Sequence, residues 1–571
     1  MRRNVIFAAV MKKVYLLFAI SILLIAAEAF GQVEHYDVHP KFTYAPTVVE
    51  QQMLPTWYQR ATASTFPEAP VTALAEFHPM GGVMIAYPLG VPVSLVRELS
   101  LITNVKVLVY PASDSNTAKS YFQSSGVNID NVQFWVVNHD SYWTRDYGPW
   151  FILDGNDDIA VVDFTYNRPA RPHDDAALVS VTNKMGMERY EMPMVHTGGN
   201  YMVNGYGTAA STSLILEENP NQTEASLTNM AHNYLGVDNY LITNDPLGDY
   251  IAHIDCWGKF LAPDKVLIGQ VPANDPRYSE YEIAANLFAN TVTAWGNHYQ
   301  VYRVYEPGSG NYVTPYTNSL ILNDHVFVPV TGTQWDDDAI DVYEQAMPGY
   351  TIVPVMESYY TPWYNTDALH CRTHELADKD MLYIKHFPVF SGSEGMVGQS
   401  IKATIKPLSG ASLVEDSIRV FYRINEGEWQ SALMYLVYGD EYEAFITADL
   451  HDEIDYYIFA KDQSGRRVCH PYIGAADPHH FTMNTVGIEE HGSARVQVDV
   501  FPNPATDRLV VRGEDLRSVE VYDSFGRLFT TFAVTGTMQM TDCTSWPAGV
   551  YLLNITNAQG QKVQKKVVKV L

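Results

Sequence analysis

Two adjacent segments, Val326-Phe-Val-Pro-Val330 and Asp336-Asp-Asp-Ala-Ile-Asp-Val-Tyr-Glu-Gln-Ala-Met347, decide the class of the main fold. The first is short, apolar and rich in valine, which is typical of a buried β-strand. The second has acidic residues in its first turn and apolar residues on one helical face, and a Pro-Gly pair follows it. Similar strand-like runs at Val105–Tyr110 and Val266–Val271 alternate with helical stretches. We therefore predict an α/β domain over residues 71–388.

The residues that follow have a different pattern. Strand-like runs such as Val420–Ile424 and Tyr442–Ile446 are separated by turn signals, which predicts a small antiparallel sandwich over residues 389–486. A polar linker at 487–496 leads to a last all-β domain at 497–571, which closes with a lysine-rich run.

The first residues have the pattern of an export signal. Lys12 and Lys13 precede the apolar run Val14–Ala27 and then small residues, so residues 1–31 are predicted to be a secretory signal peptide. The apolar run is too short to span a bilayer. Residues 32–70 lack sustained periodicity, and we expect a leader or pro-segment there.

Composition excludes some classes of function. At 571 residues the chain is too long for one hydrophobic core, so several domains are expected. Its formal charge of −28 argues against a nucleic-acid partner and suits a cationic ligand. Four widely spaced cysteines exclude a disulfide framework despite the predicted export.

Three short signatures carry candidate catalytic groups. They are Trp-Thr-Arg-Asp at 143–146, His-Ile-Asp at 253–255 and His-Cys at 370–371, and the glycine-rich segment Thr197–Asn200 lies between the first two. Together they offer a thiol, an imidazole and two carboxylates. A guanidinium group is planar, charged and forked, so two carboxylates can hold it through paired hydrogen bonds.

These groups are sufficient for attack on a guanidinium carbon. We predict that Asp146 and Asp255 hold the cation and that Cys371 attacks its central carbon as a thiolate. His253 is predicted to protonate the departing ammonia and later to activate a water molecule. The expected reaction is deimination, which converts a guanidinium to a ureido group.

Other interpretations of the same residues exist. Asp146 could form an ordinary ion pair with its neighbour Arg145, and His253 could be a structural histidine in a strand. Cys256 is an alternative nucleophile, but in a strand its side chain would point away from the face shared by His253 and Asp255. A zinc hydrolase could use a different set of ligands, namely His253, Asp255, Cys371 and His374.

The chain resembles the agmatine and peptidylarginine deiminase branch of the guanidine-modifying superfamily. The resemblance covers residues from about 75 to 380, and the matching segments are Trp143–Pro149, Gly198–Asn200, His253–Phe260, Tyr316–Ser319 and Leu369–Cys371. It implies a five-bladed α/β propeller with the active site on its axis. A surface adhesin built on an inactive version of this domain is the non-enzyme alternative, and the intact catalytic set argues against it.

The resemblance also implies substrate contacts. Agmatine deiminases usually have a glycine-rich segment before the nucleophile, whereas this chain has Asn365-Thr-Asp-Ala-Leu369, and secreted bacterial peptidylarginine deiminases are more similar. Trp143 is implied to pack on the guanidinium. Arg168 and Arg171 are implied to hold the carboxylate of a C-terminal arginine, although from sequence alone both would be ordinary solvated arginines. Tyr250 and Asn318 match further substrate-lining positions.

The last domain is similar to the C-terminal sorting signal of type IX secretion, on Phe501–Pro504, Tyr522–Arg527, Gly549–Leu552 and the closing lysines. This implies a partner in the secretion machinery and attachment at the outer-membrane surface. A carbohydrate-binding module is the alternative for this domain. The middle sandwich is similar to the immunoglobulin-like domain of secreted peptidylarginine deiminases.

The sequence as a whole predicts a secreted or surface-attached deiminase of a Gram-negative bacterium. Its expected substrates are arginine-containing peptides and proteins, and its expected product is peptidyl-citrulline. No cofactor is expected, and calcium independence is inferred from the bacterial relatives and from the lack of an EF-hand-like loop. The alternative is an agmatine deiminase-like hydrolase that acts on a small guanidine compound.

Overall fold

The computed structural model describes residues 65–248, 251–308, 313–363, 367–393 and 398–484, and, near the C-terminus, 498–503, 505–513, 515–523, 527–534, 537–547, 549–558 and 562–570. The predicted signal peptide, most of the predicted leader and the predicted linker lie outside these residues. The chain divides into two compact units, Met1–Thr485 and Val486–Leu571, and each is described by itself. Among the described residues, no helix has both the length and the apolar character needed to cross a bilayer.

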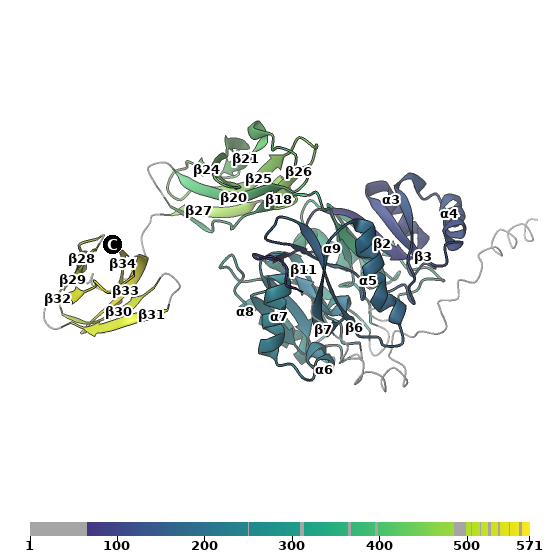
Figure 1. Cartoon of the computed structure of the whole chain (residues 1–571), viewed down its shortest axis with the longest axis horizontal. Coiled ribbons are helices and arrows are strands. Elements are labelled where there is room, and N and C mark those ends of the chain that lie inside the picture. Colours follow the sequence, from purple (N-terminus) through teal and green to yellow (C-terminus); the bar gives the residue numbers. More distant parts are fainter. Residues whose placement is uncertain are drawn as a thin grey trace, which may run out of the picture. The chain divides into compact units, whose positions relative to one another are not determined.

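Helices and strands alternate along the α/β region (Figure 1), and its described residues form five separate sheets. Their orders are β17–β2–β3–β4, β1–β5–β6–β7, β10–β9–β8, β11–β12–β13 and β14–β15–β16. The predicted α/β class is therefore confirmed.

The strands of the first three sheets are β17 (His374–Ala377), β2 (Met80–Ala86), β3 (Asn104–Val109) and β4 (Val132–Val136); β1 (Thr72–Ala73), β5 (Trp150–Leu153), β6 (Ile159–Tyr166) and β7 (Arg189–His196); and β10 (Asn239–Thr243), β9 (Thr208–Thr212) and β8 (Met202–Val203). The other two sheets contain β11 (Gly258–Ala262), β12 (Lys265–Gln270) and β13 (Gln300–Tyr305), and β14 (Leu320–Leu322), β15 (His325–Val330) and β16 (Thr351–Met356).

Each of the five sheets contains the same arrangement of strands. A short strand pairs antiparallel with a longer one, as in β5–β6, β8–β9, β11–β12, β14–β15 and β17–β2. The longer strand then pairs in parallel with the next strand after a helical crossover, as in β6–β7, β9–β10, β12–β13, β15–β16 and β2–β3.

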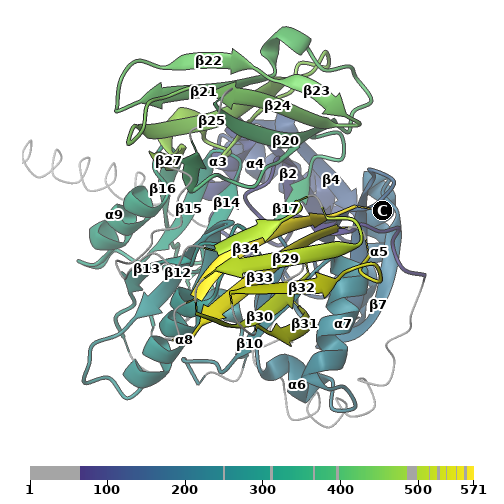
Figure 2. The same ribbon diagram turned by 90° about the vertical axis from the view of Figure 1, so that its left-hand side faces the viewer.

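The crossover helices are α3 (Val93–Ile102), α4 (Asp114–Ser124), α5 (Pro172–Met185), α6 (Leu214–Glu218), α7 (Glu224–Leu235), α8 (Tyr278–Asn290) and α9 (Asp336–Ala346). The predicted helix is α9, which lies beside the β14–β15–β16 sheet (Figure 2) and buries Ala339, Tyr343 and Ala346 as its pattern indicates.

The residues after the α/β region form two sheets around a separate apolar core. One has the order β18 (Leu382–Lys385), β20 (Gln399–Pro407), β24 (Glu441–Ile446) and β23 (Tyr435–Tyr438). The other has the order β19 (Ser391–Ser393), β27 (His479–Asn484), β25 (Glu453–Lys461), β21 (Arg419–Ile424) and β22 (Gln430–Leu433), and β26 (Arg467–His470) pairs with β25. Alternating burial along β25 agrees with the predicted strand pattern.

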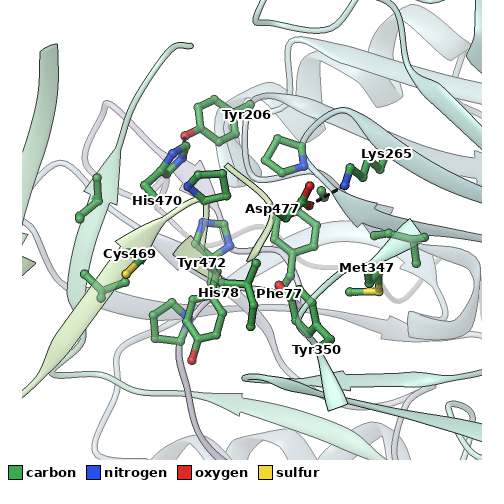
Figure 3. A pocket seen from close by; sticks show the side chains of 18 of the residues that line it. Phe77, His78, Tyr206, Lys265, Met347, Tyr350, Cys469, His470, Tyr472 and Asp477 are labelled. Atoms are coloured by element: carbon green, nitrogen blue, oxygen red, sulfur yellow. Dashed lines mark hydrogen bonds and ion pairs between the residues drawn. The ribbon is translucent and has the colours of Figure 1, made fainter. Parts of the chain in front are cut away.

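A cavity of about 80 Å³ lies where this sandwich meets the α/β region (Figure 3). Its lining is mainly apolar and includes several aromatic rings, and Lys265 Nζ lies 2.5 Å from Asp477 Oδ2 across the junction. His470 Nε2 lies 2.7 Å from the Tyr206 hydroxyl, and His470 Nδ1 lies 2.9 Å from His479 Nε2. None of the predicted site residues that the structure describes lines this cavity.

The C-terminal unit is entirely β in its described residues. Its sheets have the orders β28 (Val498–Phe501), β29 (Arg508–Gly513) and β32 (Met538–Asp542), and β31 (Leu528–Ala533), β30 (Leu516–Tyr522), β33 (Gly549–Asn557) and β34 (Lys562–Lys569). The lysine-rich run is therefore the strand β34, which pairs antiparallel with β33.

Candidate active site

Five turns, one for each sheet of the α/β region, carry the sequence signatures. Each turn precedes the short strand that pairs antiparallel with the longer strand of its sheet, which is β5, β8, β11, β14 or β17. The turns are 143–146, 198–200, 254–256, 316–319 and 369–372. This shared position explains why signatures far apart in the sequence lie close together in space.

Contacts between neighbouring turns hold them in a ring. The Gly198 amide donates to the Asp146 carbonyl at 2.9 Å, and the Arg145 amide donates to the Cys371 carbonyl at 3.2 Å. The His370 amide donates to the Asn318 carbonyl at 3.1 Å, and Asn318 Nδ2 donates to the Asp255 carbonyl at 3.4 Å. The turns 198–200 and 254–256 are also in contact, because a Cβ added at Gly199 would lie 2.4 Å from His253 Nδ1.

The thiol of Cys371 is buried beside a carboxylate and an amide. Its Sγ lies 3.7 Å from Asp255 Oδ2 and accepts a hydrogen bond from Asn318 Nδ2 at 3.2 Å. Asn318 Oδ1 accepts hydrogen bonds from the amides of Ala368, His370 and Cys371. Asn318 therefore fixes the backbone of the predicted nucleophile as well as contacting its sulfur.

Cys256 also lies at this site, and the prediction that its side chain points away is wrong. Residues Ile254–Cys256 form a 3₁₀ turn before β11, with His253 at its N-cap, so the alternation of a strand does not apply to them. Cys256 Sγ lies 3.6 Å from Asp255 Oδ1 and is hydrogen-bonded with Cys371. That hydrogen bond lowers the pKa of the Cys371 thiol, but burial and nearby carboxylates, above all Asp255, raise it to about 12.

Asp146 and His253 form the other side of the site. Their nearest charged atoms, Oδ1 and Nδ1, are 3.6 Å apart. Among the described residues, neither Asp146 Oδ1 nor either ring nitrogen of His253 has a hydrogen-bond partner, although all three are buried. Burial and Asp255 raise the pKa of Asp146 to about 7 against the opposing effect of nearby arginines, and burial and Arg168 lower the pKa of His253.

The predicted carboxylate-binding arginines lie between β6 and α5. Arg168 and Arg171 are only 6% and 1% exposed, so the interpretation of both as solvated surface residues is wrong. The guanidinium of Arg171 lies over the ring of Trp143, and Nη1 donates to the Tyr166 hydroxyl at 3.3 Å. Tyr166 in turn lies 3.5 Å from Asp146 Oδ2. Tyr250 lies outside the described residues.

Comparison with known proteins agrees with this geometry. Residues 74–376 match the family of Porphyromonas-type peptidyl-arginine deiminases. The chain belongs to this family. Membership identifies the α/β domain as a deiminase, which hydrolyses the carbon–nitrogen bond of an amidine group. Residues 499–569 match the secretion system C-terminal sorting domain, so the chain carries this domain as predicted.

Individual relatives are more distant. The deiminase is 25% identical over 266 residues to a putative agmatine deiminase of Yersinia pestis, which covers 39% of this chain and 72% of that protein. It is 25% identical over 329 residues to a putative agmatine deiminase of Vibrio parahaemolyticus, which covers 49% of this chain and 90% of that protein. The X-ray structure of a putative agmatine deiminase, 20% identical, covers 54% of this chain and 96% of that one with a TM-score of 0.50, so the fold is shared.

Arg145 and His374 make other contacts than the alternative interpretations require, which were an ion pair of Arg145 with Asp146 and a zinc site that includes His374. Arg145 forms a bidentate pair with Glu375, at 3.2 and 2.5 Å, and not with Asp146. His374 Nδ1 bonds the Glu375 carbonyl at 2.6 Å, and the ring packs against Gly148. In the described part of the chain, no three His, Cys, Asp or Glu side chains are grouped as metal ligands, so the zinc alternative has no geometric support.

Sequence reasoning missed two residues of this site. His370 Nδ1 lies 2.7 Å from Asp255 Oδ2, and Glu76 Oε2 lies 3.3 Å from His370 Nε2. The position of His370 next to Cys371 was a usable signal. Nothing near Glu76 in the sequence indicated a role.

Proposed function

We propose that this deiminase converts peptidyl-arginine to peptidyl-citrulline and ammonia through a covalent intermediate on Cys371. The observation that supports this most directly is the contact of the Cys371 sulfur with Asp255, in a ring of turns that also carries Asp146 and His253. Two carboxylates, a thiol and an imidazole are the groups that guanidinium hydrolysis needs.

The raised pKa of the Cys371 thiol supports an order in which the substrate binds before the thiol attacks. The pKa of the Cys371 thiol is about 12, so a thiol and not a thiolate is present at neutral pH. A guanidinium held by Asp146 and Asp255 adds a positive charge beside the sulfur. This charge offsets the carboxylates that raise the pKa of the thiol, so the bound substrate promotes its own attack.

The proposed reaction has two halves. The thiol of Cys371 gives its proton to His253, and the resulting thiolate forms a C–S bond to the guanidinium carbon. His253 then passes this proton to one nitrogen, and the C–N bond breaks to release ammonia. A water molecule then attacks the resulting thiouronium carbon while His253 takes up its proton. The C–S bond breaks, the thiol regains its proton, and the ureido product leaves.

Two buried arginines favour a substrate with a carboxylate. Arg168 and Arg171 lie beside Trp143 and Asp146, where they would hold the carboxylate of a C-terminal arginine by bidentate hydrogen bonds. Tyr250, outside the described residues, is proposed as a further substrate contact. Agmatine has no carboxylate, so it could not use these arginines. The names of the curated relatives nevertheless make agmatine the second candidate substrate.

The architecture suits an exported enzyme. We propose that the five sheets are the blades of a propeller and that the sandwich is immunoglobulin-like, with the domain limits predicted above. The sorting domain supports export by the type IX machinery of a Gram-negative bacterium, with release or attachment at the cell surface.

Mass spectrometry of paired peptides tests this function. One peptide ends in arginine and the other carries the same arginine internally. The expected result is replacement of one NH by O in the first peptide, with ammonia release, and a slower reaction of the second. Faster turnover of agmatine than of either peptide would favour the alternative. An unchanged rate after Cys371→Ala would exclude the thiol mechanism.

A further inference from the structure

His370, which has no part in the proposed reaction, lies between the buried carboxylate of Asp255 and the partly buried carboxylate of Glu76. Its Nδ1 is 2.7 Å from Asp255 Oδ2 and its Nε2 is 3.3 Å from Glu76 Oε2. The His370 backbone is fixed as well, because its amide donates to Asn318 Oδ1 at 3.0 Å. The imidazole therefore has one defined position between the two carboxylates.

Glu76 is itself held firmly. Its Oε1 accepts the Ile321 amide at 2.6 Å, and its Oε2 lies 2.5 Å from Lys259 Nζ. Glu76, Lys259, Asp255 and His370 all line a second cavity of about 60 Å³, whereas Cys371, Asp146 and His253 do not. Asp255 and His370 thus contact this cavity, and Asp255 also contacts the nucleophile.

The contacts define which nitrogen of His370 carries the proton. Burial, followed by the charges of Arg145 and Lys259, lowers the pKa of His370 far enough to keep the ring neutral. A neutral imidazole has one N–H, and the shorter contact places it on Nδ1, toward Asp255. Nε2 then faces Glu76, and the carboxylate of Glu76 forms an ion pair with Lys259. The backbone contact with Asn318 holds His370 in place, and the ring orients Asp255.

We propose that His370 is a positioning residue that holds the Asp255 carboxylate in the orientation needed to bind the guanidinium. This inference rests on the proposed function. Asp255 Oδ2 lies 2.7 Å from His370 Nδ1 and 3.7 Å from Cys371 Sγ, so one oxygen is shared between the imidazole and the nucleophile. The N–H of His370 donates to the same oxygen that accepts the thiol proton, and so weakens the hold of that oxygen on the proton. It also prevents rotation of the carboxylate away from the substrate.

Two amide substitutions separate this role from simple packing. In His370→Asn the amide nitrogen can take the place of Nδ1, whereas in His370→Gln it takes the place of Nε2 and the hydrogen bond to Asp255 is lost. We expect His370→Asn to stay within about threefold of wild-type kcat/KM, and His370→Gln to lose about 10- to 100-fold, the effect of one hydrogen bond to a buried charge. Most of the loss should be in KM, because Asp255 holds the substrate before any bond changes.

Alkylation of Cys371 by iodoacetamide provides a readout that needs no substrate. His370→Gln should react more slowly than His370→Asn and wild type at the same pH, because Asp255 Oδ2 then binds the thiol proton more tightly. A wild-type enzyme without activity on any arginine peptide would defeat the proposed function and leave this alkylation comparison to decide the role of His370. Equal kinetic losses in both variants with unchanged thermal midpoints, or equal alkylation rates in all three proteins, would overturn the inference.

Discussion

The guanidinium carbon of Arg171 lies 4.5 Å from the centre of the Trp143 ring. The resemblance to deiminases implies that this ring packs on the guanidinium of the substrate. In the structure, the ring contacts the guanidinium of Arg171. Such stacking fixes a long side chain at little entropic cost. Trp143 therefore orients Arg171. The hydroxyl of Tyr166 accepts a hydrogen bond from Arg171 and lies close to Asp146, so it connects these two residues.

Substitution of this arginine tests the substrate preference. Arg171→Ala should raise KM for a peptide with C-terminal arginine by about 10- to 100-fold, because a charge-assisted bidentate contact is lost. The rate on internal arginine should change little. Arg97→Ala is the control, since Arg97 pairs with Glu98 on the surface. Equal losses on both peptides would contradict a role in carboxylate binding.

The pH dependence of catalysis should report Asp146. Its pKa is raised to about 7 in the free protein, so the carboxylate becomes neutral as the pH falls through this value. A neutral Asp146 cannot pair with a cation, so kcat/KM should fall about tenfold for each pH unit below that pKa. Asp146→Asn should lower kcat/KM at neutral pH and remove this slope. A wild-type profile of kcat/KM that stays flat as the pH falls below about 7 would refute the assignment.

Much of this site could be predicted because each signature is local. The Trp-Thr-Arg-Asp and His-Cys segments each carry their chemistry within a few residues, and the apolar strands that follow them are equally visible in the sequence. The α/β class followed from strand and helix patterns such as those of β15 and α9, which the structure confirms. The fivefold repetition of a signature before a short strand was also present in the sequence, although it was not recognised.

The errors came from features that depend on contacts across the chain. Alternation was assumed at Cys256, but the peptide forms a 3₁₀ turn there, and a turn directs side chains by its own geometry. Arg171 is buried against Trp143, a contact between segments that no local pattern encodes. The contact of His370 with Glu76 joins the turn before β17 to the segment between β1 and β2, which are far apart in the sequence, so only the fold reveals it.

The role of Cys256 can be measured separately from nucleophilic attack. Its hydrogen bond with Cys371 lowers the pKa of the Cys371 thiol. Cys256→Ala should therefore slow alkylation of Cys371 and lower kcat several-fold, while citrulline still forms. Cys371→Ala is the matched substitution and should abolish turnover. If Cys256→Ala were the inactive variant and Cys371→Ala remained active, the two sulfurs would have to exchange roles.

Acid should weaken the junction between the sandwich and the deiminase domain. Burial lowers the pKa of His386 to about 4, and it lowers the pKa of His470 and His479 well below the usual value. Between a pH of about 6.5 and 4, the unfolded chain binds more protons than the folded one, so stability is present above this window and is lost as the pH falls through it. Thermal midpoints measured across this window should fall, and His386→Gln should reduce the dependence. If the thermal midpoint of His386→Gln fell with pH as steeply as that of the wild type, the acid sensitivity would come from groups other than His386.

Gly199 lies so close to His253 that a side chain at this position should disturb the imidazole. A Cβ at this glycine would lie 2.4 Å from His253 Nδ1 and 2.9 Å from Asp146 Oδ1, closer than atoms can approach. Gly199→Ala should therefore displace the imidazole and lower kcat by at least about 100-fold, the contribution of general acid–base catalysis. The control is Gly549→Ala, where an added Cβ meets open space. Because the clash involves side-chain atoms of the site, the thermal midpoint should change little, and full activity in Gly199→Ala would show that His253 need not hold this position for turnover.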